Sequence, residues 1–192
     1  MNKKTVALTE EQYTNIIGTI KSGFVCADGH VVKPNERVAT VLVLEANLGL
    51  RISDILRLRL SDIIRDGERY RLDIVEQKTK KKREFTVPSE IYIFMQNYAL
   101  EHNIKPVARL FAISERTVQN HLQMVCDSFG YENISTHSFR KLFATSIYTN
   151  NNYNIELVRV LLQHSSVAIT QKYIGIQKKE VEEALQRHIK LL

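Results

Sequence analysis

The chain has 192 residues, of which 44% are hydrophobic and 25% charged, a balance typical of a globular protein and unlike that of a disordered one. No apolar run approaches the ~20 residues that a membrane-spanning helix needs, and the polar start Met1–Thr5 is no signal peptide, so we expect a cytoplasmic protein without a membrane partner. The net charge of +6, from 27 Lys and Arg against 21 Asp and Glu, suits a polyanionic partner.

The first third of the chain is predicted to form three helices. Thr9 stands three residues before Gln12, as in a capping box, and apolar residues then repeat at helical spacing up to Gly23. Residues 23–33 are predicted to form a loop. Pro34 and Asn35 introduce a second helix that runs to Leu48 and Gly49. A third helix is predicted to follow, with an apolar side made of Ile52, Ile55, Leu56 and Leu60.

Between residues 62 and 88 the helical spacing gives way to alternation. Residues 69–75 and 83–87 are predicted strands, the second of which ends at Pro88. Asp66 and Gly67 predict a tight turn from an earlier short strand. The run Lys-Thr-Lys-Lys-Lys at residues 78–82 lies between the two longer strands and predicts a basic hairpin tip.

Helical spacing returns after Ser89 and is interrupted near Pro106, Gly130 and residues 150–152. We therefore expect one α+β domain over residues 1–192 that is mainly α-helical, with a small three-stranded antiparallel sheet. Residues 1–8 are expected to be a leader. Residues 177–192 are expected to form an amphipathic tail helix, with one side made of Val181, Ala184, Leu185, Ile189 and Leu192.

Six side chains could together cleave and rejoin a phosphodiester, although each looks ordinary alone. Such chemistry needs a nucleophile, cations around the phosphate oxygens and a proton donor for the leaving oxygen. Each residue also has an ordinary structural explanation. Arg51 could form a surface ion pair with Asp54. A lysine is common in an exposed hairpin loop, and a histidine at a helix C-terminus is stabilised by the helix dipole. The candidates are Arg51, Lys78, His137, Arg140, His164 and Tyr173.

The order, spacing and neighbours of these residues resemble those of the tyrosine recombinase (phage integrase) family over roughly residues 8–185. The matching segments are Gly-Leu-Arg-Ile-Ser-Asp at residues 49–54, Thr-His-Ser-Phe-Arg-Lys at 136–141, Leu-Leu-Gln-His-Ser-Ser at 161–166 and Thr-Gln-Lys-Tyr at 170–173. The resemblance implies the fold of that family's catalytic domain. It also implies a site-specific DNA recombinase that cleaves and rejoins DNA through a 3′-phosphotyrosine intermediate.

The resemblance implies a role for each candidate. Arg51, Arg140 and His164 would hold the scissile phosphate, and Lys78 would protonate the leaving 5′ oxygen. His137 would assist proton transfer at the nucleophile, which would be Tyr173. Asp54 matches an acid that supports the catalytic residues without contacting the phosphate. Basic residues that could contact DNA are Lys80, Lys81, Lys82, Arg83, Arg116 and Lys141.

Three positions depart from the family pattern without removing a catalytic group. Lys141 follows the motif arginine where many members have histidine, and Gln163 and Gln77 stand where many have glycine. The several lysines of the hairpin leave open which one is the acid, although Lys78 is best placed. The family's separate N-terminal DNA-gripping domain has no counterpart before Thr9, so we expect either an excised catalytic domain or a short recombinase of the kind that inverts DNA segments.

Double-stranded DNA is the expected partner, bound by a monomer that forms a tetramer on paired sites by exchanging the tail helix. We expect no cofactor, no small-molecule substrate, and neither metal nor ATP. Cys26 and Cys126 have no metal-ligand spacing. They are expected to be reduced, with a disulfide between them as the alternative. The expected role is to serve a mobile element or DNA inversion.

Two other functions fit part of the sequence. Residues 114–122, Ser-Glu-Arg-Thr-Val-Gln-Asn-His-Leu, resemble the recognition helix of a helix-turn-helix regulator, a non-enzymatic class. That interpretation leaves the spaced cations and Tyr173 unexplained. A type IB topoisomerase shares the nucleophile chemistry but only relaxes supercoils, and the segments around Arg51 and His164 favour recombination.

Overall fold

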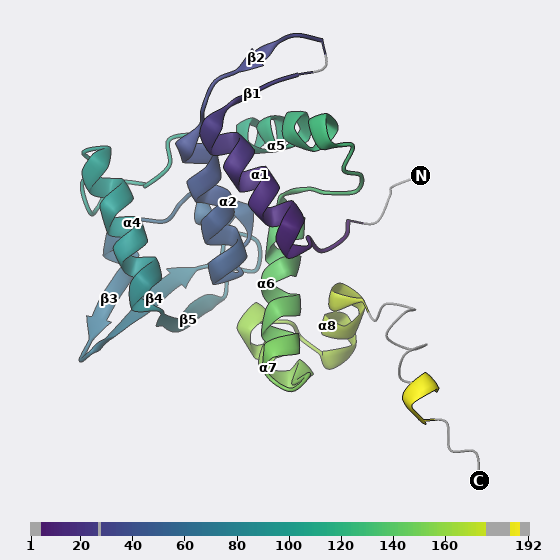
Figure 1. The fold of residues 1–192 in the computed structure, drawn as a ribbon. Helices are drawn as coiled ribbons and strands as arrows, with labels where there is room; N and C mark the ends of the chain where they lie inside the picture. Colours follow the sequence, from purple (N-terminus) through teal and green to yellow (C-terminus); the bar gives the residue numbers. More distant parts are fainter. Residues whose placement is uncertain (1–4, 27, 176–184, 189–192) are drawn as a thin grey trace. The chain divides into compact units, whose positions relative to one another are not determined.

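The computed structural model describes residues 5–26, 28–175 and 185–188. It contains two compact units, Met1–Phe143 and Ala144–Leu192. The boundary falls within one helix, α6 (Thr136–Asn150). The chain is mainly helical with a three-stranded antiparallel sheet, as predicted (Figure 1). No helix of the described residues is long and apolar enough to cross a membrane.

In the first unit, α1 (Glu10–Ser22) packs against α2 (Glu36–Leu48) and α5 (Glu115–Phe129). The predicted capping box is present, since Thr9 Oγ1 accepts from the Gln12 backbone N–H at 3.1 Å and the Gln12 side chain accepts from the Thr9 N–H at 3.0 Å. Asn35 caps α2 by accepting from the Val38 N–H at 3.1 Å. These local hydrogen bonds explain why both helices begin where the sequence predicts.

Residues 23–33 are not a plain loop, which corrects the prediction. They form a short hairpin of β1 (Phe24–Val25) and β2 (Val31–Val32), with Phe24 opposite Val32. The Cys26 N–H donates to the His30 carbonyl at 2.8 Å to close it. Aromatic and β-branched residues at both ends favour pairing, but runs of two residues are too short to show alternation.

The predicted third helix is also shorter than expected. It spans only α3 (Ile52–Ile55), and a 3₁₀ turn, η1 (Leu60–Asp62), follows. The backbone is extended at Arg59 (φ −126°, ψ 154°), and the Asp62 carboxylate accepts from the Arg59 N–H at 2.8 Å. Leu58 is buried, and its carbonyl accepts from the Leu110 N–H at 2.8 Å. Tertiary packing of Leu58 therefore overrides the helical spacing.

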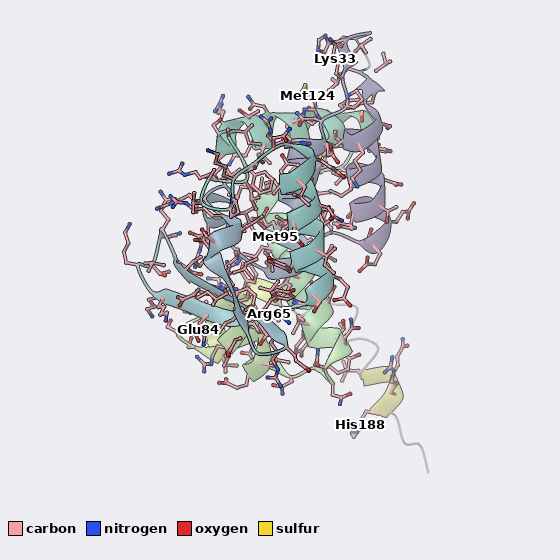
Figure 2. The ribbon with its side chains drawn as sticks, turned by 90° about the vertical axis from the view of Figure 1, so that its left-hand side faces the viewer. Lys33, Arg65, Glu84, Met95, Met124 and His188 are labelled. Atoms are coloured by element: carbon pink, nitrogen blue, oxygen red, sulfur yellow. The ribbon has the colours of Figure 1, made fainter. Side chains whose placement is uncertain are left out.

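The sheet has the order β3-β4-β5, with β3 (Ile63–Asp66), β4 (Arg69–Val75) and β5 (Lys82–Val87). One face is covered by α4 (Ser89–Glu101), whose Tyr92 ring stacks on that of Tyr70 at 3.9 Å. Met95 of α4 is fully buried, whereas Arg65 and Glu84 of the sheet reach solvent (Figure 2). The packing of α4 against β4 thus supports one strand of the hairpin between β4 and β5.

Helix α5 is not the second helix of a helix-turn-helix. Residues 102–114 separate it from α4 without helical structure, whereas that motif joins its helices by a turn of ~3–4 residues. His121 of α5 is buried, and its ring contacts that of Phe24 at 6.4 Å between centroids. Part of the supposed recognition surface therefore belongs to the core.

The second unit contains α7 (Ile155–Leu162) and α8 (Val167–Ile174), which pack against each other. Asn154 caps α7, and Ser166 caps α8. Of the predicted tail helix, only residues 185–188 are described, and they are helical. The rest of that prediction lies outside the described residues.

Candidate active site

Arg51 stands at the junction between two helices. Helix α2 ends at Gly49, whose backbone is left-handed (φ 57°, ψ 25°), and Arg51 is the extended N-cap residue of α3 (φ −73°, ψ 150°). A Cβ at Gly49 would lie 2.3 Å from the Phe143 ring, so this position requires glycine for both its backbone and its space. The sharp junction directs the Arg51 side chain, which is 19% exposed, towards the hairpin between β4 and β5.

A buried carboxylate, Glu76, meets Arg51 there. Its Oε2 accepts hydrogen bonds from Arg51 Nη1 and, at 2.8 Å, from Thr79 Oγ1. Its Oε1 accepts from Arg83 Nη1 at 2.9 Å. Burial alone would raise the pKa of Glu76, but the hydrogen bonds from Thr79, Arg83 and Arg51 outweigh it and hold that pKa below its usual range. Glu76 is therefore a negatively charged hydrogen-bond acceptor for Arg51, one of the residues expected to bind the phosphate.

The loop that carries Lys78 is anchored on both sides. The Gln77 N–H donates to Asp54 Oδ1 at 2.8 Å, and the Glu76 N–H donates to the Lys81 carbonyl at 3.0 Å. The predicted supporting acid, Asp54, is buried and thus fixes the backbone next to Lys78. The Lys78 side chain itself is exposed to solvent.

His137 and Arg140 lie one turn apart in the first turns of α6. Arg140 is buried, at 1% exposure. Burial, and then the positive charges of Arg140, Lys141, Arg51 and Lys78, lower the pKa of His137. Four cations from three separate segments of the chain therefore act electrostatically on this imidazole.

The first unit thus brings together four of the six predicted catalytic residues. The other two belong to the second unit, where they lie against each other. The His164 and Tyr173 rings contact edge to face, with centroids 5.2 Å apart at 76°. Helix α7 ends at Gln163 in a left-handed conformation (φ 54°), which explains why a glycine suits this position in the family pattern.

The predicted DNA-contacting residues divide into two groups. Lys80, Lys81 and Arg116 are exposed, and Lys82 is exposed but forms ion pairs with Asp73 at 3.1 Å and Glu84 at 3.2 Å. Arg83 and Lys141 are buried. Arg83 is 2% exposed and bound to Glu76, and Lys141 Nζ donates to the Thr5 carbonyl at 2.8 Å. These last two side chains support the fold and do not present a charged surface.

Sequence reasoning missed a second buried acid, Glu45 of α2. It is fully buried, and neither carboxyl oxygen has a hydrogen-bond partner among the described residues. Burial raises the pKa of Glu45 well above its usual range, although the Arg140 guanidinium acts against this rise and Glu115 adds to it. Glu45 lies in the helical register of Val38, Val41 and Leu42, so the apolar spacing of α2 could have identified this carboxyl as buried.

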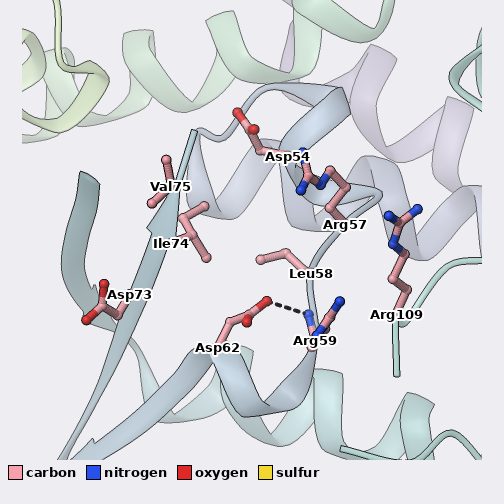
Figure 3. Close-up of a pocket in the computed structure, with 9 residues that line it drawn as sticks. All are labelled: Asp54, Arg57, Leu58, Arg59, Asp62, Asp73, Ile74, Val75 and Arg109. Carbon is pink, nitrogen blue, oxygen red and sulfur yellow. Dashed lines mark hydrogen bonds between the residues drawn. The ribbon is translucent and has the colours of Figure 1, made fainter. Parts of the chain in front are cut away.

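A groove beside the hairpin carries unassigned arginines. A cavity of about 250 Å³ is lined by Asp54, Arg57, Leu58, Arg59, Asp62, Asp73, Ile74, Val75 and Arg109 (Figure 3). Arg57 and Arg109 also line a neighbouring hollow with Ser53 and Gln77. Both arginines are exposed, and a planar guanidinium matches a phosphate oxygen pair. The cavity is also lined by three aspartates, so its lining is polar and mixed in charge, and its exposed arginines are the part that could contact a phosphate.

The described residues include one group that could hold a metal ion, formed by Glu36, Glu101 and His102, whose ligand atoms lie within 4.8 Å of one another. It joins the N-terminus of α2 to the C-terminus of α4 and includes none of the candidate catalytic residues. Exposed acidic groups of this kind are common without a metal. Cys26 and Cys126 are both free, as expected.

Comparison with known proteins gives a family match. The model of the phage integrase family matches residues 7–180. The probable integrase/recombinase YoeC of Bacillus subtilis is 33% identical over 154 residues, which cover 78% of this chain and 83% of YoeC. Tyrosine recombinase XerA of Pyrococcus furiosus is 25% identical, and the match covers 94% of this chain but 61% of XerA.

Solved structures show the same fold. The XerH site-specific recombinase bound to a palindromic difH substrate has a TM-score of 0.73 at 20% identity, with 97% of this chain and 54% of that one covered. The catalytic domain of bacteriophage HP1 integrase has a TM-score of 0.64 at 18% identity, with 96% of each chain covered. The chain spans about half the length of the XerH recombinase chain and 61% of XerA.

Proposed function

The chain belongs to the phage integrase family, and on that basis we propose that it is a site-specific DNA recombinase that cleaves and rejoins DNA through a covalent bond to Tyr173. The observation that supports this most is the position of His137 amid the charges of Arg51, Lys78 and Arg140. A neutral imidazole that several cations surround suits a site where a phosphodiester binds and a proton must be accepted.

We propose the following cleavage step. The Tyr173 oxygen attacks phosphorus, a new O–P bond forms, and the bond from phosphorus to the 5′ oxygen breaks. His137 takes the phenol proton, and Lys78 gives a proton to the departing 5′ oxygen. Arg51, Arg140 and His164 stabilise the negative charge that develops on the non-bridging oxygens. Attack by a 5′-hydroxyl reverses each of these transfers and rejoins the strand.

The charges around the site favour this assignment. A phenol has a pKa near ~10, so it attacks poorly unless its proton is removed and cations stabilise the product charge. The lowered pKa of His137 keeps its imidazole neutral at neutral pH, and only the neutral form can accept the proton. The phosphotyrosyl bond conserves the energy of the broken bond, so we propose that neither ATP nor a metal is needed.

Exposed basic residues would hold the rest of the DNA. Lys80, Lys81 and Arg116 are exposed, and the groove with Arg57 and Arg109 adjoins Gln77, the neighbour of Lys78. We propose that the DNA backbone follows these side chains to the active site. We further propose that the reaction serves a mobile element, which the words integrase and bacteriophage in relatives' names favour, or DNA inversion.

The test is a covalent adduct. A target is selected by denaturing capture from a pool of nicked duplexes with randomised sequence, and wild-type protein should form with it an adduct that survives denaturation in excess chelator. Tyr173→Phe should abolish the adduct, whereas Tyr148→Phe and Tyr153→Phe should retain it. Persistence in Tyr173→Phe would falsify the nucleophile assignment. Relaxation of a plasmid without joining of two sites would favour a topoisomerase.

We also propose that the monomer assembles into a tetramer on paired sites through the segment after Tyr173. Deletion of residues 180–192 should leave single-site binding nearly intact and remove synapsis and strand exchange. Mobility shifts with one and two sites measure both properties. Full-rate recombination by the truncated protein would show that the segment does not link protomers.

A further inference from the structure

Glu76 supports more than the fold of its hairpin. Its carboxylate is fully buried and uses both oxygens, one for Arg83 at 2.9 Å and the other for Arg51 and for Thr79 at 2.8 Å. We propose that Glu76 is a positioning residue for Arg51, which orients the guanidinium so that its remaining N–H groups meet the scissile phosphate. This inference rests on the proposed function.

The proposal follows first from the shape of arginine. A guanidinium has five N–H donors in a rigid plane, so a carboxylate on one edge decides where the others point. Arg51 is 19% exposed while Glu76 is fully buried, so the carboxylate holds the inner edge and leaves the outer edge accessible. A phosphate that binds this outer edge finds its partner already ordered, which lowers the entropy cost in the transition state.

The proposal follows also from charge. Burial, and then the nearby Arg140, lower the pKa of Arg83 to about 10, although Glu76 raises it, and Arg51 adds a further lowering. Three guanidiniums therefore repel one another around this point. The negative charge of Glu76 offsets that repulsion and lets Arg51 remain beside the others before DNA arrives.

A purely structural role is the alternative. Glu76 could serve only to neutralise Arg83, which is 2% exposed and donates to the Gly49 carbonyl at 3.3 Å. The two roles predict different cleavage rates for a variant in which Arg83 is replaced by an uncharged residue and needs no acidic partner. In Glu76→Gln/Arg83→Met both members of the buried pair become uncharged, while Arg51 keeps its charge and loses its carboxylate.

The experiment compares variants of the full chain on the captured nicked duplex, with the single-turnover rate of adduct formation, DNA affinity and Tm as readouts. Glu76→Asp keeps a negative charge at this position but draws the carboxylate back by one methylene from Arg51 and Arg83 alike. Its rate therefore reports on Arg51 when its Tm stays near that of wild type. We expect Glu76→Asp and Glu76→Gln/Arg83→Met to lower the rate about 10- to 100-fold, because a ~1 Å misplacement of a catalytic group costs that much. DNA affinity should change less than about 2-fold, since phosphate contacts elsewhere dominate it.

A double-mutant cycle tests whether Glu76 affects the cleavage rate through Arg51. On an Arg51→Ala background, Glu76→Asp should lower the rate no further, because its target is absent. Glu84→Gln removes an exposed acid from the same hairpin and serves as the matched control at the wild-type rate. Wild-type rates in Glu76→Asp, or effects that multiply with Arg51→Ala, would overturn the proposal. If the double variant does not fold, Glu76→Asp still decides.

A measurement without catalysis separates this inference from the proposed function. The Nη–Hη resonances of Arg51, assigned by their loss in Arg51→Ala, should be resolved in DNA-free wild-type protein, because the bond from Nη1 to Glu76 hinders rotation about Nε–Cζ. In Glu76→Asp that rotation should average them. Equal line shapes in both proteins would refute the positioning role even if the protein forms no adduct. A wild-type protein without an adduct would refute the proposed function alone.

Discussion

The Nδ1 of His164 lies 3.0 Å from the hydroxyl oxygen of Thr170, one turn of α8 before Tyr173. The Thr170 hydroxyl has a single hydrogen, which it donates to the Ser166 carbonyl at 3.3 Å. It therefore accepts from His164 Nδ1–H. This pairing selects the tautomer of His164 and keeps its ring edge-on to Tyr173.

Replacement of Thr170 tests this pairing. Thr170→Val removes the acceptor at nearly constant volume, so His164 should lose its orientation and adduct formation should slow about 5- to 10-fold, the effect of a hydrogen bond of ~1 kcal/mol. Thr170→Ser keeps the hydroxyl and should react like wild type. Single-turnover cleavage measures both variants. Equal rates for Val and Ser would mean that the pairing has no part in cleavage.

The choice of proton donor can be tested with a modified substrate. A 5′ bridging sulfur leaves without protonation, so it should restore cleavage by Lys78→Ala to near the wild-type rate while it does little for Arg51→Ala. Lys80→Ala and Lys81→Ala keep the acid and should show no such specific rescue. If the sulfur substrate rescues either of these variants and not Lys78→Ala, the proton donor is the rescued lysine. The rates come from paired oxygen and sulfur substrates.

Glu45 should make stability depend on pH. Its pKa is raised above the ordinary value of 4.5, so the folded state retains a proton that the unfolded state has lost. Stability should therefore fall as pH rises from about 4.5 to the raised pKa, by up to ~1.4 kcal/mol per pH unit. Glu45→Gln cannot ionise, so its free energy of unfolding should rise relative to that of wild type as pH increases. Urea denaturation from pH 5 to 8 measures the difference, and parallel curves would contradict it.

Gly49 should tolerate no side chain. Gly49→Ala forces a left-handed alanine and a Cβ 2.3 Å from the Phe143 ring, so unfolding should become easier by about 2 kcal/mol or more. Gly67 has a similar φ of 62° but open space around it, and Gly67→Ala should cost only ~1 kcal/mol. The comparison of the two by thermal unfolding isolates the steric part. Similar losses would mean that Phe143 moves aside.

Local patterns predicted what local interactions determine. The Thr9 capping box and the Asp66-Gly67 turn depend on residues a few positions apart, and both are present. The early end of α3 depends on packing of Leu58 against a segment that begins some fifty positions later, which no window on the sequence contains. The same limit hid the contact between Arg51 and Glu76.

Arg83 shows a pattern that could have been used. Composition alone groups it with the lysines before it. Alternation along β5 places Arg83 on the same side as Phe85 and Val87 and puts Lys82 and Glu84 on the other. Strand parity therefore predicts an inward Arg83, and an inward arginine requires a buried acid. In the structure that acid is Glu76.

The three hydrogen bonds of Glu76 also limit how such enzymes can be recombined in the laboratory. A chimaera that receives the β4–β5 loop of another recombinase would change the acceptor of Arg51 and the tie between Gln77 and Asp54 at once. Residues 76–83 are therefore not an exchangeable cassette for altering target choice. A functional graft would have to transfer the loop together with residues 49–54, as one module drawn from two distant parts of the gene.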